Sequence, residues 1–215
     1  IVIGYALVPM PSGRHDGAGR VGGAGPRLLA GPLLLLGVAI ATYVAAEVGV
    51  SNWIVRFLEP APIQTATLAL SLYWGGLAVG RLISSAIADR FDHQRFTLAC
   101  TIAMSALLVV AIVVPSLPAS IAAFALAGVA SGPVFPMIVA LGGERYPERS
   151  AAVGGALTGM AVAGSVFYPP FMGVLSVTVG LTVAMLGTAV LGGLSAIALV
   201  AFGRSVRRAV APAVG

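Results

Sequence analysis

Six long apolar segments, separated by short stretches rich in Arg, Pro or Gly, dominate the pattern of hydrophobic and polar positions along this chain. The segments cover Leu28–Phe57, Ile63–Ala88, Phe96–Val114, Ala119–Gly142, Ala151–Val177 and Leu181–Phe202. A bilayer core about 30 Å thick requires a helix of roughly 20 apolar residues, and each segment meets or nearly meets this length. The first, second and fifth segments exceed it, which favours a tilt or a kink. The pattern therefore predicts an all-α membrane protein with six transmembrane helices.

The two ends of the chain do not follow this pattern. Residues 1–10 are apolar but too short to span a bilayer, and residues 11–27 are rich in Gly and Arg without hydrophobic periodicity. We interpret residues 1–10 as the tail of a preceding transmembrane helix and residues 11–27 as a cytoplasmic connector. Residues 28–203 then form the six-helix domain, and residues 204–215 form a cytoplasmic tail. On this interpretation the chain is a fragment, and an N-terminal part of the same protein precedes it.

The composition agrees with a membrane protein. Hydrophobic residues make up 59% of the chain and charged residues 9%, and the mean hydropathy is +1.02. A soluble domain typically carries about 25% charged residues. The net charge of +5 is the excess of twelve arginines over seven acidic residues, and the arginines lie at the predicted helix ends, so no basic face remains for nucleic acid. We therefore expect the lipid bilayer as a partner and no nucleic acid.

The arginines also predict the orientation. If the six helices alternate in direction, eleven arginines fall on one side of the membrane and only Arg56 falls on the other. The positive-inside rule makes the side with eleven arginines cytoplasmic. The sequence thus predicts a multi-pass protein of the cytoplasmic membrane with both termini in the cytoplasm.

No pattern in the chain points to an enzyme, a metal site or a cofactor. Cys100 is the only cysteine, and the two histidines, His15 and His93, lie in polar connecting segments. No cluster of His, Cys and carboxylates has the spacing of metal ligands, and no catalytic triad is apparent. The chain also lacks the GxxxxGK[ST] loop that cradles nucleotide phosphates, so ATP is not the energy source within it.

Glu47 is the strongest candidate functional residue, because it is the only charged side chain between Leu28 and Val50. A carboxylate inside a membrane costs about 2.5 kcal/mol or more, so it usually faces a bundle interior or a wet cavity. At about 1.5 Å per residue, Glu47 lies roughly 29 Å from Leu28, nearer the outer leaflet than the midplane. Glu47 is therefore either a substrate or coupling residue, or a structural carboxylate that bonds to a neighbouring helix.

Four further side chains are candidates for substrate contact, and each has a structural alternative. Asn52 could bind a substrate or pair with Arg56 on the same helical face. Trp53 could stack on a substrate ring or lie at the membrane interface, where Trp is common. Tyr73 and Tyr168 could donate to a polar substrate or pack within the bundle, since a buried Tyr needs a partner for its hydroxyl.

Glycines and prolines predict close packing and bends. The segment 128–132 has the spacing GxxxG, which lets two membrane helices approach closely. Prolines within helices remove backbone hydrogen bonds, and such interruptions often mark transporter sites. The predicted helix kinks lie at Pro133, Pro136, Pro169 and Pro170.

Several motifs resemble a known family. The loop GRLISSAIADRFDHQR is similar to the loop signature of the major facilitator superfamily, with Asp89 and Arg90 at its Asp-Arg core and Arg95 at a terminal basic position. Ser85 and Asp92 stand where the signature has glycines. The segments YVAAEVGVSNWIVRFL, YWGGLAVGR and GPVFPMIVALGGERYP together resemble the C-terminal half of the fucose-permease branch, which comprises sugar:proton symporters and their relatives.

This resemblance implies a fold and a mechanism. Members have twelve helices in two six-helix halves around a midplane site, so this chain is expected to form one half of a twelve-helix fold. The implied function is secondary active transport of a small polar solute, with a sugar and protons as the expected substrates. The main protonation sites of proton-coupled relatives commonly lie in the N-terminal half. The resemblance also implies a conformational latch at the cytoplasmic helix ends, formed by Arg81, Asp89, Arg90, Glu144 and Arg145.

Two alternatives to sugar uptake remain open at this point. The first is an efflux carrier for drugs or metabolites from the same superfamily, since such carriers share these loops. The second is a six-helix membrane scaffold or assembly subunit that transports nothing.

Overall fold

The structure is a computed structural model that describes residues 31–210, with side chains described to residue 208. Its α-helices are α2 (Pro32–Phe57), α3 (Ile63–Ile87), α4 (His93–Val113), α5 (Leu117–Ser131), α6 (Val134–Arg145), α7 (Ser150–Thr178) and α8 (Leu181–Val210). Two 3₁₀ helices, η1 (Ala88–Arg90) and η2 (Pro147–Arg149), lie in the connections. The predicted assignments of residues 1–10 and 11–27, and the last residues of the predicted tail, lie outside the described residues.

The predicted all-α fold with six membrane-spanning segments is confirmed. Within residues 31–210, six helical spans are long and apolar enough to cross a bilayer, and α5 and α6 together form one of them. The span boundaries differ little from those predicted, the largest shifts being the later start of α2 at Pro32 and the longer C-terminal end of α8. Length and apolar character were therefore enough to locate each span.

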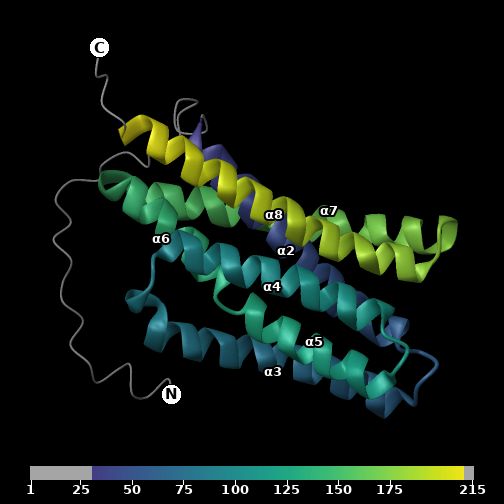
Figure 1. Ribbon diagram of the computed structural model, residues 1–215. Coiled ribbons are helices and arrows are strands. Elements are labelled where there is room, and N and C mark those ends of the chain that lie inside the picture. Colours follow the sequence, from purple (N-terminus) through teal and green to yellow (C-terminus); the bar gives the residue numbers. More distant parts are fainter. Residues whose placement is uncertain (1–30, 211–215) are drawn as a thin grey trace, which may run out of the picture.

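The helices pack as two groups of three. One group is α2 with α7 and α8, and the other is α3 with α4 and α5 (Figure 1). Contacts between α4 and α8 join the two groups, with smaller contributions from α2 against α3 and from α6 against α2 and α4. Figure 1 also shows that successive connections alternate between the two ends of the bundle, so η1, η2 and the C-terminal end of α8 lie at the same end. The arginine-rich segments are therefore gathered at one end.

Local sequence explains several helix ends. The chain enters α2 through Gly31, whose φ of 69° favours glycine, and Pro32 then occupies the first turn, where its missing N–H is tolerated. Asp92 caps α4 by accepting a hydrogen bond from the backbone N–H of Arg95 at 2.8 Å. A second glycine with positive φ, Gly180, makes the tight turn between α7 and α8. These are local features, and they fix where α2, α4 and α8 begin.

Glycines hold α3 and α5 together. A Cβ on Gly76 would overlap the carbonyl oxygen of Ala125, and a Cβ on Gly128 would overlap the carbonyl oxygen of Tyr73. Only a residue without a side chain allows backbones to approach so closely. The GxxxG spacing at residues 128–132 predicted a close contact, and the structure shows that α3 is the helix that makes it.

Large apolar side chains are exposed on the outward faces of α3 and α7. Leu82 is 71% exposed, Phe167 is 75% exposed and Val177 is 83% exposed. A soluble monomer rarely exposes contiguous apolar surface on this scale, because the cost of hydrating it is large. These faces are suited to contact with lipid or with another protein segment.

Candidate functional site

A buried carboxyl lies at the centre of the candidate site. Glu47 on α2 is only 8% exposed, and its Oε2 atom accepts a hydrogen bond from the hydroxyl of Tyr43, one helical turn earlier. The same hydroxyl lies 2.8 Å from the backbone carbonyl oxygen of Ser131, at the end of α5. Tyr43 and Ser131 are fully buried. The arrangement joins α2 to the point where α5 ends and α6 has not yet begun.

The carboxyl is set well inside the span. The helix begins at Pro32, so Glu47 lies about 22 Å from that end and about 15 Å from the end at Phe57. Side chains on a helix lean toward its N-terminus, which brings the Glu47 carboxyl back to the level of Tyr43. The carboxyl is therefore closer to the middle of the bundle than its position in the sequence alone suggests.

Tyr73 on α3 is the other buried polar group of this region. It is fully buried, and its hydroxyl has no hydrogen-bond partner among the described residues. The hydroxyl lies close enough to Ser131 and Glu47 to interact with both, without reaching hydrogen-bond geometry. A buried hydroxyl without a partner is costly, typically by about 1–3 kcal/mol. Tyr73 thus offers an unused donor beside a carboxyl, which suits recognition of a polar ligand.

Asn52 and Trp53 lie one to two turns further along α2. Asn52 is exposed and lines a surface pocket with Arg56 and Glu59 near the end of the helix. Trp53 is half-buried, and a Cβ on Gly173 of α7 would lie 3.6 Å from its ring. The Trp53 ring therefore packs on α7, while Asn52 remains accessible.

Tyr168 does not join the buried carboxyl. Its ring packs against Gly49 of α2, and its hydroxyl donates to the carbonyl oxygen of Ala184 on α8 at 3.3 Å. A Cβ on Gly187 would overlap that hydroxyl. Tyr168 is thus wedged between α2 and α8 by two glycines, and its donor is already in use.

The four predicted kink positions fall into two different settings. Pro133 lies between α5 and α6, and Pro136 follows in the first turn of α6. Because Pro133 has no N–H, the carbonyl of Val129 loses its usual helical donor. In contrast, Pro169 and Pro170 lie inside α7, which continues through them.

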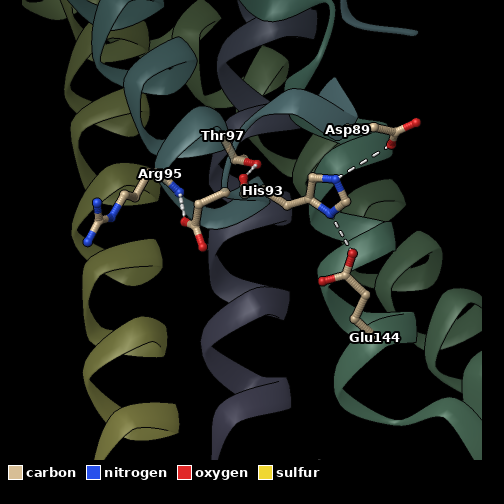
Figure 2. Close-up of polar contacts among 6 residues, drawn as sticks. Asp89, His93, Arg95, Thr97 and Glu144 are labelled. Carbon is tan, nitrogen blue, oxygen red and sulfur yellow. Dashed lines mark hydrogen bonds and ion pairs between the residues drawn. The ribbon is translucent and has the colours of Figure 1, made fainter. Parts of the chain in front are cut away.

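A second polar cluster lies at the end of the bundle that carries η1 and η2. Figure 2 shows the imidazole of His93, the first residue of α4, between two carboxylates. Its Nδ1 lies 2.5 Å from Oε1 of Glu144 on α6, and its Nε2 lies 3.9 Å from Oδ1 of Asp89. The His93 side chain is 27% exposed, Glu144 is 54% exposed and Asp89 is fully exposed. His93 therefore bridges η1 and α6.

Of the remaining residues of the expected latch, Arg90 and Arg145 lie beside this cluster, whereas Arg81 does not. Arg90 and Arg145 are exposed and form no ion pair within the part of the chain that the structure describes, and the guanidinium of Arg145 lies over the ring of Tyr146, 5.6 Å from its centroid. Arg81 is exposed on α3, and its backbone nitrogen lies beside Gly132, directly after the end of α5. The structure thus brings Asp89 and Glu144 together through a histidine rather than through the expected arginines.

Among residues 31–208 no group of three or more His, Cys, Asp or Glu side chains could hold a metal ion. The buried cluster instead contains one carboxyl, two phenolic hydroxyls and a backbone carbonyl. These groups can exchange a proton and hydrogen-bond to hydroxylated ligands, and this is the chemistry that the site can perform.

Residues 28–214 match the family model of the Major Facilitator Superfamily. The chain belongs to this superfamily. The match covers every helix of the structure, so the six spans and both polar clusters lie within the superfamily domain.

Two curated relatives of this superfamily chain come from Helicobacter pylori, and both are provisionally named as glucose/galactose transporters. The protein of strain J99 is 28% identical over 144 residues, and the protein of strain 26695 is 26% identical over 144 residues. Each alignment covers 65% of this chain and 34% of the relative. The matched region is therefore about a third of the length of these curated relatives.

Two solved structures of the E. coli fucose:proton symporter FucP share the fold of this superfamily chain. One is a single-residue variant and the other is described as the outward conformation. Each superposes with a TM-score of 0.75 at 17% identity, over 92% of this chain and 50% of the symporter. The likeness establishes that the chain has the fold of half a major facilitator.

Sequence reasoning missed two residues of these clusters. Tyr43 lies four residues before Glu47, and this spacing places two side chains on one helical face, so the pair was accessible from the sequence. His93 was interpreted only as part of a polar connection. Its partner Glu144 is 51 residues away, so no local pattern indicated the contact.

Proposed function

We propose that this superfamily chain is one half of a secondary active transporter that moves a sugar across the cytoplasmic membrane by alternating access, coupled to protons. An N-terminal half of the same protein supplies the other six helices, and both termini of the present half lie in the cytoplasm. The names of the curated relatives and of the solved symporter support a sugar as the substrate. The single observation that carries the coupling is the buried carboxyl of Glu47.

Glu47 is suited to take up and release a proton. An ionised carboxylate in a bundle interior needs compensation, and the described residues give Glu47 one hydrogen-bond donor, the Tyr43 hydroxyl. Addition of a proton removes this cost. A residue whose two charge states are stabilised differently in different conformations couples proton movement to conformational change.

Tyr73 is the proposed sugar contact within this half. Its hydroxyl is buried and has no partner among the described residues, so a ligand hydroxyl that accepts from it removes an existing penalty. Asn52 remains accessible near the end of α2 and is proposed to act at the entry of the same pathway. Trp53 and Tyr168 support the walls of the site by packing against the glycines of neighbouring helices.

The cluster of Asp89, His93 and Glu144 is the proposed conformational latch at the cytoplasmic ends of the helices. Alternating access requires two packed arrangements that differ by a few kcal/mol, and polar contacts between helix ends are a suitable way to bias them. The His93 contact holds η1 and α4 against α6. It must separate if these helices move apart.

The experiment is to replace Glu47 by Gln in the full-length protein and to measure sugar movement in two ways. Glu47→Gln keeps the size of the side chain and its hydrogen-bonding capacity but removes the titration. We expect proton-driven accumulation to fall at least about tenfold, which corresponds to about 1.4 kcal/mol. Exchange of labelled for unlabelled sugar should stay within about twofold of wild type, because exchange needs no net proton movement. Glu148→Gln, at an exposed carboxylate on η2, is the matched control.

The outcomes separate the hypotheses about Glu47. If Glu47→Gln accumulates and exchanges sugar at wild-type levels, the Glu47 carboxyl is structural. A protein that is present in the membrane but moves no sugar in either assay, in wild type as well as in the variant, would favour the efflux carrier or the scaffold.

A further inference from the structure

The Tyr43 hydroxyl lies between two oxygen atoms that can each accept its hydrogen. One is a carboxyl oxygen of Glu47, and the other is the backbone carbonyl oxygen of Ser131, 2.8 Å away. All three residues are buried, so bulk water does not compete for these hydrogen bonds. The number of protons in this group of atoms therefore decides which bonds exist.

Counting protons gives two arrangements. A phenolic hydroxyl carries one hydrogen, and a carbonyl oxygen can only accept. If Glu47 is ionised, the one hydrogen of Tyr43 is drawn to the carboxylate, because charge-assisted hydrogen bonds are roughly twice as strong as neutral ones. If Glu47 is protonated, its O–H donates to the Tyr43 oxygen, and Tyr43 can then donate to Ser131. The two arrangements differ by one proton, which comes from or returns to water.

The Ser131 carbonyl occupies a sensitive place in the fold. Ser131 is the last residue of α5, and α6 begins at Val134 after the Gly132–Pro133 step. The α5 segment packs mainly on α3 and α4, whereas α6 packs on α7 and, to a smaller extent, on α2 and α4. A hydrogen bond at Ser131 therefore acts where the two segments of one span meet and contact different neighbours.

We propose that Tyr43 is a positioning residue that couples the protonation of Glu47 to the break between α5 and α6. Uptake of a proton by Glu47 turns the Tyr43 hydroxyl toward the Ser131 carbonyl and ties α2 to the break. Loss of the proton turns the hydroxyl back to the carboxylate and frees the break from α2. This inference rests on the proposed function of Glu47 as a proton site and gives that site a conformational output.

The titratable and charged groups on the helices packed against α2 are few. From α3, the Tyr73 hydroxyl lies near Glu47 and Ser131, and Arg81 lies beside Gly132, which follows Ser131. From α7, Tyr168 contacts Gly49 of α2, but its hydroxyl is bonded to α8.

The other two neighbours of α2 carry their charges far from the cluster. The charged side chains of α6 are Glu144 and Arg145, in its last turn. Those of α8 are Arg204, Arg207 and Arg208, close to its C-terminal end. The proton count is therefore set by Glu47, Tyr43 and Tyr73, with Arg81 as the nearby cation.

The test is difference infrared spectroscopy of the full-length protein in lipid vesicles, titrated with pH. A protonated carboxyl in the membrane has a C=O stretching band apart from the protein amide bands, and Glu47→Gln identifies it by its loss. In Tyr43→Phe we expect this band to move to higher frequency, because the carboxyl loses a hydrogen-bond partner. We also expect it to persist to higher pH, because the ionised form loses its donor.

A second measurement needs no variant. With ring-labelled tyrosine in the wild-type protein, a tyrosine C–O band must change together with the Glu47 band, because Tyr43 gains an acceptor role when Glu47 is protonated. An amide band must change in the same titration as the Ser131 carbonyl gains its donor. Tyr168→Phe removes another tyrosine hydroxyl that donates to a carbonyl, and it should leave the Glu47 band unchanged.

The outcomes distinguish this inference from the function on which it rests. A Glu47 band that is present but identical in wild type and Tyr43→Phe, without a coupled tyrosine change, would overturn the role of Tyr43 and leave Glu47 as the proton site. If the spectra of the wild type and of Glu47→Gln show the same carboxyl bands at every pH, both the role of Tyr43 and the role of Glu47 as a proton site are overturned. A shifted band in Tyr43→Phe with the coupled tyrosine and amide changes supports both.

Discussion

The Nδ1 atom of His93 lies 2.5 Å from Oε1 of Glu144, which joins the first turn of α4 to the last turn of α6. The contact connects helices of two consecutive membrane spans, because α5 and α6 together form the span that follows α4. Neither side chain is fully exposed, and the backbone carbonyl of His93 also accepts a hydrogen bond from the Thr97 hydroxyl at 2.6 Å (Figure 2). The histidine is therefore held at the start of its helix in a position to bridge.

Removal of the Glu144 carboxylate should shift the balance of inward- and outward-facing states. A partly exposed pair contributes up to about 1 kcal/mol, so Glu144→Gln should change the ratio of the two states by up to about fivefold. Distance measurements between labels on the cytoplasmic helix ends report this ratio. Glu148→Gln, at an exposed carboxylate on η2, is the control. An unchanged ratio in Glu144→Gln would mean that the contact is not a latch.

Asp89→Asn should have a smaller effect than Glu144→Gln. The Asp89 side chain is fully exposed and lies 3.9 Å from His93, so water screens its contribution. The same distance measurement and sugar exchange assays rank the two variants. A larger effect of Asp89→Asn would show that Asp89 acts through groups other than His93.

The α3–α5 contact should not tolerate a side chain at Gly76. A Cβ there would overlap the Ala125 carbonyl oxygen, and overpacking of this kind costs about 1–3 kcal/mol or more. Gly76→Ala should lower the thermal stability and the yield of folded protein in detergent. A Cβ on the adjacent Gly75 would meet no atom of the described residues within 4 Å, so Gly75→Ala should stay near wild type. Equal loss in both variants would implicate helix propensity or lipid contact rather than α3–α5 packing.

Cysteine labelling in intact cells tests the proposed orientation. In a Cys100→Ser background, a membrane-impermeant reagent should modify a cysteine at Ser116, in the loop before α5, and should not modify one at Glu148. Both positions are exposed, so accessibility to the reagent depends on the side of the membrane. The positive-inside rule predicts this pattern, and the reverse labelling would invert the topology.

Much of the fold was predictable from the sequence, because membrane spans are defined by local properties. Length and apolar character identify a helix that can cross a bilayer, and a charged residue such as Glu47 is conspicuous against that background. Turn and cap residues such as Gly180 and Asp92 determine the backbone conformation of only the few residues next to them in the sequence. The GxxxG spacing at residues 128–132 likewise predicted a close helix contact, although not its partner.

The pairings within the sites required the tertiary structure. Tyr43 and Glu47 share a helical face by their spacing, but the approach of the Ser131 carbonyl depends on where packing against α3 and α4 places the end of α5. The choice of His93 as the partner of Glu144, and the isolation of the Tyr73 hydroxyl among the described residues, also depend on how the helices pack. The hydrophobicity and charge of each segment determine, independently of the other segments, whether it enters the membrane. Which side chains then meet is decided by the shape of the packed helices, and that shape is a property of all six spans together.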